Sequence, residues 1–316
     1  MVVFESNKGI VMNSETYLFR AKIISKWESE GIYGPPIITT PSVLPLKIGS
    51  FILESNPNTQ AYLEQELEGT NEYKTNPDYP LSQIYLELHL TVNKNGDARF
   101  LAEEHFQEVE ALFRLFKQGG MYIRLHWPTW KVVDHKLHNI ISFDFTPKLS
   151  NLNMHYLKSY KIDDEMLEEF KIFFEQYWNS VHSKKQPMYS SLLRLSSSYE
   201  RLTLDERMVD LIIALEALFN DGGDNLAFKV ALRCSSLIFP PGSDRKRCYD
   251  DIRLFYGNRS KILHGSKPTT RYSEDAINNL ENIVRVSILE FYKLDNNGFP
   301  INSKDDLDSK LFLLDH

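Results

Sequence analysis

Alternation of apolar and polar residues marks the first half of the chain as rich in β-structure. In "QIYLELHLTV" (83–92) apolar side chains recur at every second position from Ile84 to Leu90, which is the period of a strand with one buried face. The segment "EEHFQEVEALFRLFKQGG" predicts an amphipathic helix that stops at Gly119 and Gly120. Further short strand-like runs lie at 16–24, 121–127 and 140–145.

These patterns together predict that residues 1–157 form an α+β domain with a mostly antiparallel sheet. Asn95-Gly96, directly after the alternating run, is typical of a tight turn between strands. The proline-rich stretch 33–46 is expected to be an irregular connection or an edge segment, because proline cannot donate to a sheet ladder.

From residue 158 onward the apolar spacing becomes helical. The segment 163–182 begins with acidic residues, which a helix N-terminus favours, and places apolar side chains along one face. Turn-rich stretches separate further helical patterns and predict an all-α bundle over residues 158–316. The further helices are expected at about 187–199, 203–220, 224–239, 245–264 and 273–294.

Composition and charge narrow the class of protein. Hydrophobic residues make up 42 % and charged residues 25 % of the chain, which indicates a globular protein rather than a disordered chain or a membrane bundle. The N-terminus lacks the pattern of a signal peptide and no run is apolar enough to span a membrane, so the expected location is cytoplasmic. The net charge of −7 argues against indiscriminate coating of nucleic acid. Residues 186–271 nevertheless carry more Lys and Arg than Asp and Glu, which permits contact with phosphates.

Cysteine and histidine spacing predicts neither a metal site nor a cofactor. Cys234 and Cys248 belong to no Cys-x-x-Cys or Cys/His cluster and fit a reducing compartment. His135 and His138 lie three residues apart, but no third ligand accompanies them, and a solvated loop is the preferred interpretation. The aromatic "HWPTW" (126–130) could stack a base, although such residues more often belong to a core or an interface.

The stretch "FYGNRSKILHG" (255–265) carries the strongest candidate chemistry. Gly265 stands where a helix commonly ends, so His264 is expected in the last turn, where the helix dipole favours a cation. Arg259 precedes His264 by five residues, a rotation of about 140° on a helix. One helix therefore cannot aim both side chains at one atom, although both can border a shared groove. Arginine and histidine near a helix end are also common without any catalytic role.

A second candidate group consists of charged residues in very apolar helices. Glu216 lies within "RMVDLIIALEALF" (207–219), where an unpaired carboxylate would be costly. Arg233 lies within "FKVALRCSSLI" (228–238) and is one expected partner, in a buried ion pair that would fix the register of the two helices. The alternative partner of either residue is the motif around Arg259.

The order and spacing of these three segments resemble the HEPN superfamily of helical nucleases, most closely its Apea-like branch, over residues 160–295. The resemblance implies a dimeric helical domain and metal-independent cleavage of RNA, often transfer RNA, by a toxin or a phage-defence effector. It assigns catalysis to Arg259 and His264. Supporting roles fall to Glu216, Arg233, Asn258 and Ser260, where Ser260 replaces the Asn, Asp or His that commonly follows the arginine.

The chemistry of these residues fits that implication. RNA supplies its own nucleophile, the 2′-OH, so a metal-free enzyme needs a proton carrier such as His264 and a cation such as Arg259 for the phosphate. Two-fold symmetry would place both pairs around one groove. The first domain is then expected to select RNA or to bind a trigger ligand or partner protein. The alternative is an inactive helical module that dimerises or binds a ligand or nucleotide.

Overall fold

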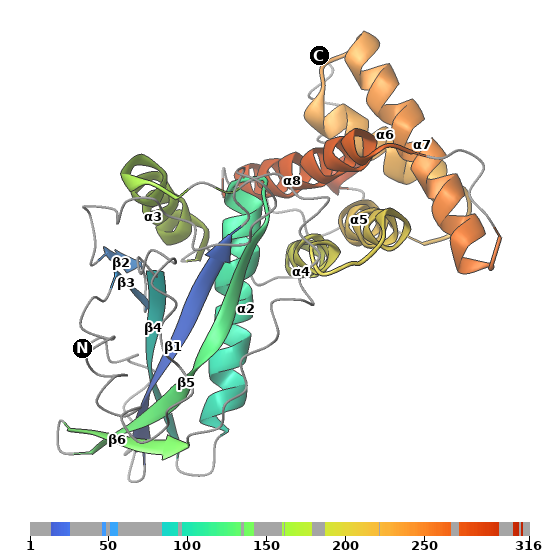
Figure 1. Cartoon of the computed structure of the whole chain (residues 1–316). Helices are drawn as coiled ribbons and strands as arrows, with labels where there is room; N and C mark the ends of the chain where they lie inside the picture. Colours follow the sequence, from blue (N-terminus) through green and yellow to red (C-terminus); the bar gives the residue numbers. More distant parts are fainter. Residues whose placement is uncertain are drawn as a thin grey trace. The chain divides into compact units, whose positions relative to one another are not determined.

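The computed structural model describes residues 14–25, 46–48, 51–55, 84–93, 97–133, 136–141, 160, 162–178, 187–220, 222–266, 272–296, 306–309 and 311 of the 316-residue chain. The chain divides into two compact units (Figure 1). Among the described residues, the first unit holds a β-sheet and two helices, and the second holds the helices from Met188 onward. No helix among these residues is both long enough and apolar enough to cross a membrane.

A six-stranded antiparallel sheet forms the frame of the first unit, in the order β2-β3-β4-β1-β5-β6. In β4 the alternating Leu86 and Leu88 are buried, opposite Ala21 and Phe19 of the central strand β1. The period-two pattern therefore marks the face that enters the core. The strands are β1 (Ser14–Ser25), β2 (Leu46–Ile48), β3 (Phe51–Ser55), β4 (Ile84–Asn93), β5 (Met121–Val133) and β6 (Lys136–Ile141).

Several details of this sheet differ from the sequence prediction. The strand expected at 140–145 is β6, which begins four residues earlier. Strands β2 and β3 were not predicted, because runs of three and five residues are too short to show a period. The turn at Asn95-Gly96 and the stretch 33–45 lie outside the described residues.

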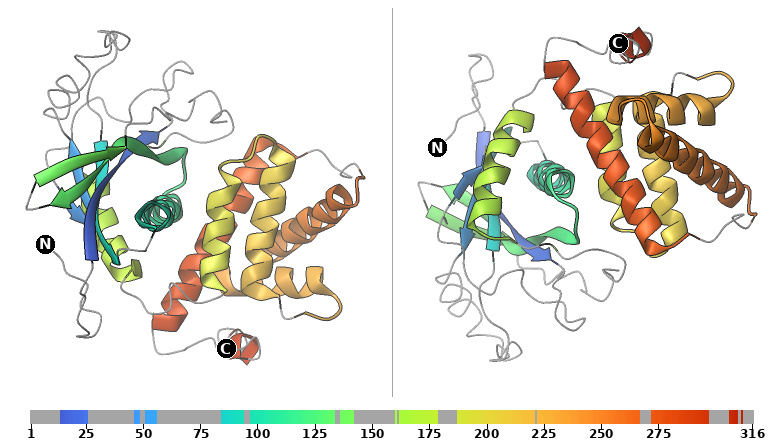
Figure 2. Two further views of the ribbon diagram at one scale, coloured as in Figure 1. Left: turned by 90° about the horizontal axis from the view of Figure 1, so that it is seen from below. Right: turned by 90° about the horizontal axis from the view of Figure 1, so that it is seen from above.

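Helix α2 (Ala98–Phe116) packs on one face of the sheet, against β1, β4 and β5 (Figure 2). The helix begins where Asp97 accepts hydrogen bonds from the backbone N–H groups of the first turn. Its buried pair of Glu110 and Arg114 joins it to β5, because Arg114 Nε donates to the carbonyl of Met121 at 3.0 Å. The amphipathic pattern predicted this helix, which ends at Phe116, before the two glycines.

Helix α3 (Asp164–Trp178) shifts the boundary between the two units. The prediction placed it in the helical half, but it groups with the sheet as far as Glu175. The ring of Phe170 stacks on Phe113 of α2 with 3.7 Å between ring centroids, and Phe174 meets Phe51 of β3 edge to face. A helical pattern indicates which face of a helix is apolar but not which core that face enters, so the boundary at 157 is wrong.

The second unit is all helical within the described residues, as predicted. Each helix begins and ends within two residues of its expected position. Helix α5 begins with a capping box in which Thr203 and Glu206 satisfy each other's backbone N–H groups. The helices are α4 (Met188–Ser198), α5 (Leu204–Phe219), α6 (Leu226–Ile238), α7 (Ser243–Leu263) and α8 (Glu274–Asn296).

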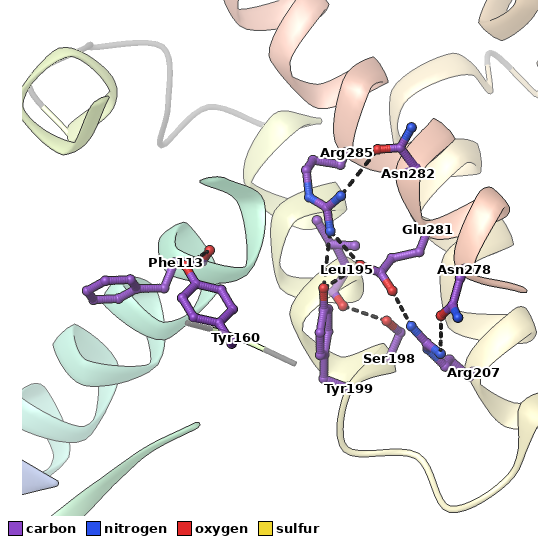
Figure 3. A network of polar contacts seen from close by, with 10 residues as sticks. All are labelled: Phe113, Tyr160, Leu195, Ser198, Tyr199, Arg207, Asn278, Glu281, Asn282 and Arg285. Atoms are coloured by element: carbon purple, nitrogen blue, oxygen red, sulfur yellow. Dashed lines mark hydrogen bonds and ion pairs between the residues drawn. The ribbon is translucent and has the colours of Figure 1, made fainter. Parts of the chain in front are cut away.

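A buried polar network joins α4, α5 and α8 inside the second unit (Figure 3). The fully buried Glu281 of α8 pairs with Arg207 of α5 and with Arg285 one turn further along α8. It also accepts a hydrogen bond from the hydroxyl of Tyr199, which follows α4. Arg207 in turn donates to the side-chain oxygen of Asn278 at 3.0 Å. Two arginines thus share one carboxylate, and removal of that carboxylate would leave both charges buried without it.

Candidate functional site

The end of α7 has the geometry that the sequence predicts. His264 is the residue that caps the helix, and Gly265 follows with a left-handed φ of 74°. The N–H of Gly265 donates to Ile262 O at 3.0 Å, and the N–H of Ser266 donates to Lys261 O at 2.8 Å. These two bonds form a Schellman motif, which requires a positive φ at position 265. The side chain of His264 is consequently exposed at the helix end, where the negative end of the dipole lies.

Arg259 is held by two residues rather than left free in solution. Its Nη2 lies 2.9 Å from Oε2 of Glu216 on α5. The other carboxylate oxygen, Oε1, accepts a 2.6 Å hydrogen bond from the hydroxyl of Tyr256. The guanidinium carbon of Arg259 also lies 5.6 Å from the centroid of the Tyr256 ring, within the range of a cation–π contact. Arg259, Glu216 and Tyr256 form a closed polar triad between α5 and α7.

The triad is partly buried, and this changes the chemistry of its members. The side chains of Arg259 and Glu216 are 21 % and 15 % exposed. Burial, followed by the hydrogen bond to Glu216, raises the pKa of Tyr256 to about 12, so this phenol stays a donor throughout the physiological range. Nε of Arg259 is buried and has no hydrogen-bond acceptor among the described residues. The guanidinium therefore keeps donor capacity beyond the ion pair with Glu216.

The expected ion pair between Glu216 and Arg233 does not form, and Glu216 instead pairs with its alternative expected partner, the motif residue Arg259. Both oxygens of Glu216 are bound, but by Arg259 and Tyr256. Arg233 makes a two-pronged contact with Asp308, at 2.7 Å and 2.6 Å, and its Nη1 donates to the carbonyl of Phe219 at 2.7 Å. Arg233 thus binds the last carbonyl of α5 and the C-terminal segment. Burial of two opposite charges in neighbouring helices indicates that each needs a partner, without saying which one.

The remaining predicted residues lie on different sides of α7. Asn258 is buried and faces the interior of the unit, while Ser260 and His264 are exposed. Within one chain, Arg259 is directed to α5 and His264 lies at the free end of the helix. The two residues that are expected to be catalytic therefore have different surroundings within one chain.

Two candidate features of the first unit remain undescribed. The side chains of Trp127, Trp130 and His138 and the whole of His135 lie outside the described residues. Where side chains are described, no three His, Cys, Asp or Glu residues are grouped as metal ligands.

Sequence reasoning missed two residues that shape the site. Tyr256 lies three residues before Arg259, a spacing that puts both on one helical face, so this contact could have been inferred. Asp308 lies 75 residues after Arg233, and no local pattern connects the two. The first is a consequence of helix periodicity and the second of tertiary packing alone.

Comparisons with known proteins give no independent identification. No protein-family model matches the chain, and neither the curated proteins nor the solved structures gave a significant match. The site must therefore be interpreted from its own chemistry.

Proposed function

We propose that the helical unit is a metal-independent endoribonuclease of the HEPN type, acting on RNA in the cytoplasm as a toxin or defence effector. The observation that carries the proposal is the state of Arg259. This guanidinium is held by Glu216 and Tyr256, yet the Arg259 side chain stays 21 % exposed, so part of the cation is accessible to a ligand. An immobilised cation with donor capacity left is suited to a phosphate whose negative charge grows in the transition state.

His264 supplies the proton transfer in this proposal. The 2′-OH attacks the adjacent phosphorus and loses its proton to a base, while the departing 5′-oxygen gains a proton from an acid. The products are a 2′,3′-cyclic phosphate and a 5′-OH end. Because Arg259 faces α5 and His264 lies at the helix end, we place the groove between two copies of the chain, so that one copy's arginine works with the other's histidine.

The test is cleavage of total RNA by the purified full chain in the presence of EDTA. Truncation of His264 to Ala should lower the cleavage rate by about a hundredfold or more, the usual contribution of a general acid or base. Truncation of Arg259 to Ala should lower it by a similar factor, because the developing phosphate charge is no longer met. Both variants should keep the wild-type circular dichroism spectrum. The matched controls are Arg99→Ala and His105→Ala on α2, which should cleave as wild type does.

A symmetric dimer is the second requirement of the proposal. Sedimentation at micromolar concentration should show a dimer that both site variants retain. A monomeric chain that still cleaves RNA would refute the shared groove while leaving the reaction intact.

Two observations favour a different function. Glu216 offsets the charge of Arg259. Ser260 stands where active members of the HEPN superfamily commonly have Asn, Asp or His. Both features fit an inactive module that dimerises or binds a nucleotide. Intact RNA after incubation with wild type, together with a stable dimer, would select this alternative.

A further inference from the structure

Helices α6 and α7 pack side by side (Figure 1). Together they carry an exposed phenylalanine and a half-buried tyrosine next to an arginine. Phe228 of α6 is 46 % exposed, and its ring meets that of Tyr249 of α7 edge to face, with 6.1 Å between centroids. The guanidinium carbon of Arg253 lies 5.7 Å from the centroid of the Tyr249 ring, and Arg253 Nη1 lies 3.2 Å from the Tyr249 hydroxyl. We name Phe228, Tyr249 and Arg253 the aromatic platform.

The platform lies in line with His264 along α7. Steps of three or four residues lead from Tyr249 through Arg253, Gly257 and Ser260 to His264, and such steps follow one side of a helix. Tyr249 is half-buried and the other four are exposed. From Tyr249 to His264 the chain advances fifteen steps, or about 22 Å, along the helix axis. This length suits several nucleotides of an extended strand.

Gly257 lies in the middle of this line, where helix propensity disfavours it. Glycine inside a helix costs about 1 kcal/mol relative to alanine. A Cβ at Gly257 would meet no atom within 4 Å, so nothing in the described chain requires a glycine there. Glycine is used where another molecule must approach the backbone closely. The position therefore points to a ligand, or a second chain, that lies on this side of α7.

The charge of α7 distinguishes between these occupants. The helix carries six basic and three acidic residues in a chain of net charge −7. Lys246 is paired with Asp250 one turn away, whereas Arg253 lies against an aromatic ring. A basic helix with a partly exposed aromatic pair is complementary to a polyanion with flat rings and less so to a second copy of the same basic helix.

We propose that the aromatic platform binds an unpaired base of single-stranded RNA, whose backbone then runs over Gly257 to His264. The inference rests on the proposed function, because it names where the substrate of that reaction is held. Phe228 offers a face for stacking, and Arg253 offers a charge for the adjacent phosphate. Bases in a duplex are already stacked on each other, so a duplex should bind less well.

The test measures binding separately from cleavage. The probe is a short fluorescein-labelled 2′-O-methyl RNA, which lacks the attacking hydroxyl and stays intact with wild type. Fluorescence anisotropy should show that Phe228→Ala weakens binding by about five- to a hundredfold, the effect of losing one stacked base. Phe228→Trp should bind at least as well as wild type. Arg253→Ala should reduce the slope of log affinity against log salt by about 0.7.

The matched control is Leu232→Ala, one turn further along α6. Leu232 is 44 % exposed, close to the value for Phe228, but has no π-face. The Leu232→Ala variant should therefore keep the RNA affinity of wild type. Equal losses of affinity for Leu232→Ala and Phe228→Ala, or a shift of the sedimentation equilibrium by both, would overturn the platform in favour of a protein interface.

Photo-crosslinking of a 5-iodouracil RNA probe uses the wild-type chain, so its result does not depend on whether a variant folds. Crosslinks should map by mass spectrometry to Phe228 or Tyr249, and crosslinks confined to other segments would overturn the platform. RNA cleavage that Phe228→Ala leaves unchanged, with unchanged binding, would overturn the platform and leave the nuclease standing. RNA binding that depends on Phe228, without any cleavage, would support the platform and refute the nuclease. A wild-type chain that binds no RNA would refute both the platform and the nuclease.

Discussion

Replacement of Glu281 by glutamine should strongly destabilise the helical unit. The carboxylate is 0 % exposed and pairs with Arg207 and Arg285, which are themselves buried. The glutamine keeps the shape of the side chain but removes the negative charge. Both guanidinium groups would then remain buried without the carboxylate that they share.

The expected loss follows from the burial. Removing one partner of a buried ion pair costs about 3 to 5 kcal/mol in free energy of unfolding, and here two pairs depend on one carboxylate. For a domain of this size each kcal/mol corresponds to roughly 2–4 °C in Tm. A decrease of about 10 °C or more is therefore expected. The exposed pair of Glu290 and Lys293 provides the control, because Glu290→Gln should cost less than about 1 kcal/mol.

The assay is urea unfolding of the full chain followed by circular dichroism at the helical band, to which the second unit contributes most helices. A second variant changes all three charged residues, with Arg207 and Arg285 replaced by Met and Glu281 by Leu. It should recover most of the stability, since none of the three network charges remains buried. A Glu281→Gln protein within about 1 kcal/mol of wild type would refute the reasoning, because the network would then be solvated or rearranged.

Two further predictions concern α7. Burial and the hydrogen bond to Glu216 raise the pKa of Tyr256 to about 12. Wild type should therefore have a larger free energy of unfolding than Tyr256→Phe. This difference should be fully present below about pH 10 and should disappear as the pH rises towards 12. In Glu216→Gln the phenol should titrate closer to pH 10 by absorbance, and an unchanged titration would contradict the triad. Among the glycines, Gly265→Ala should cost about 1 kcal/mol because φ is 74°, whereas Gly257→Ala, in open space within a helix, should stabilise the chain by about 0.5–1 kcal/mol. The measurement is thermal unfolding. Equal changes in Tm for Gly265→Ala and Gly257→Ala would contradict a helix end at His264.

The sequence by itself determined the local structure. A period of two predicted β4, and helical spacing between turn-rich stretches predicted α4 to α8 within two residues. The end of α7 follows from Gly265 in the same way, because only the nearest turn of backbone decides a left-handed cap. Three-residue strands such as β2 carry no such signal, since pairing with a neighbour stabilises them.

Only the tertiary structure decided which residues meet. Burial of Glu216 and Arg233 was readable from their apolar neighbours, but their partners, Arg259 and Asp308, depend on how distant helices pack. The same holds for α3, whose apolar face entered the core of the sheet rather than that of the helices. A helix pattern encodes the direction of its apolar face relative to its own axis. The surface that this face contacts is selected by the fit of whole elements, which no local window of sequence contains.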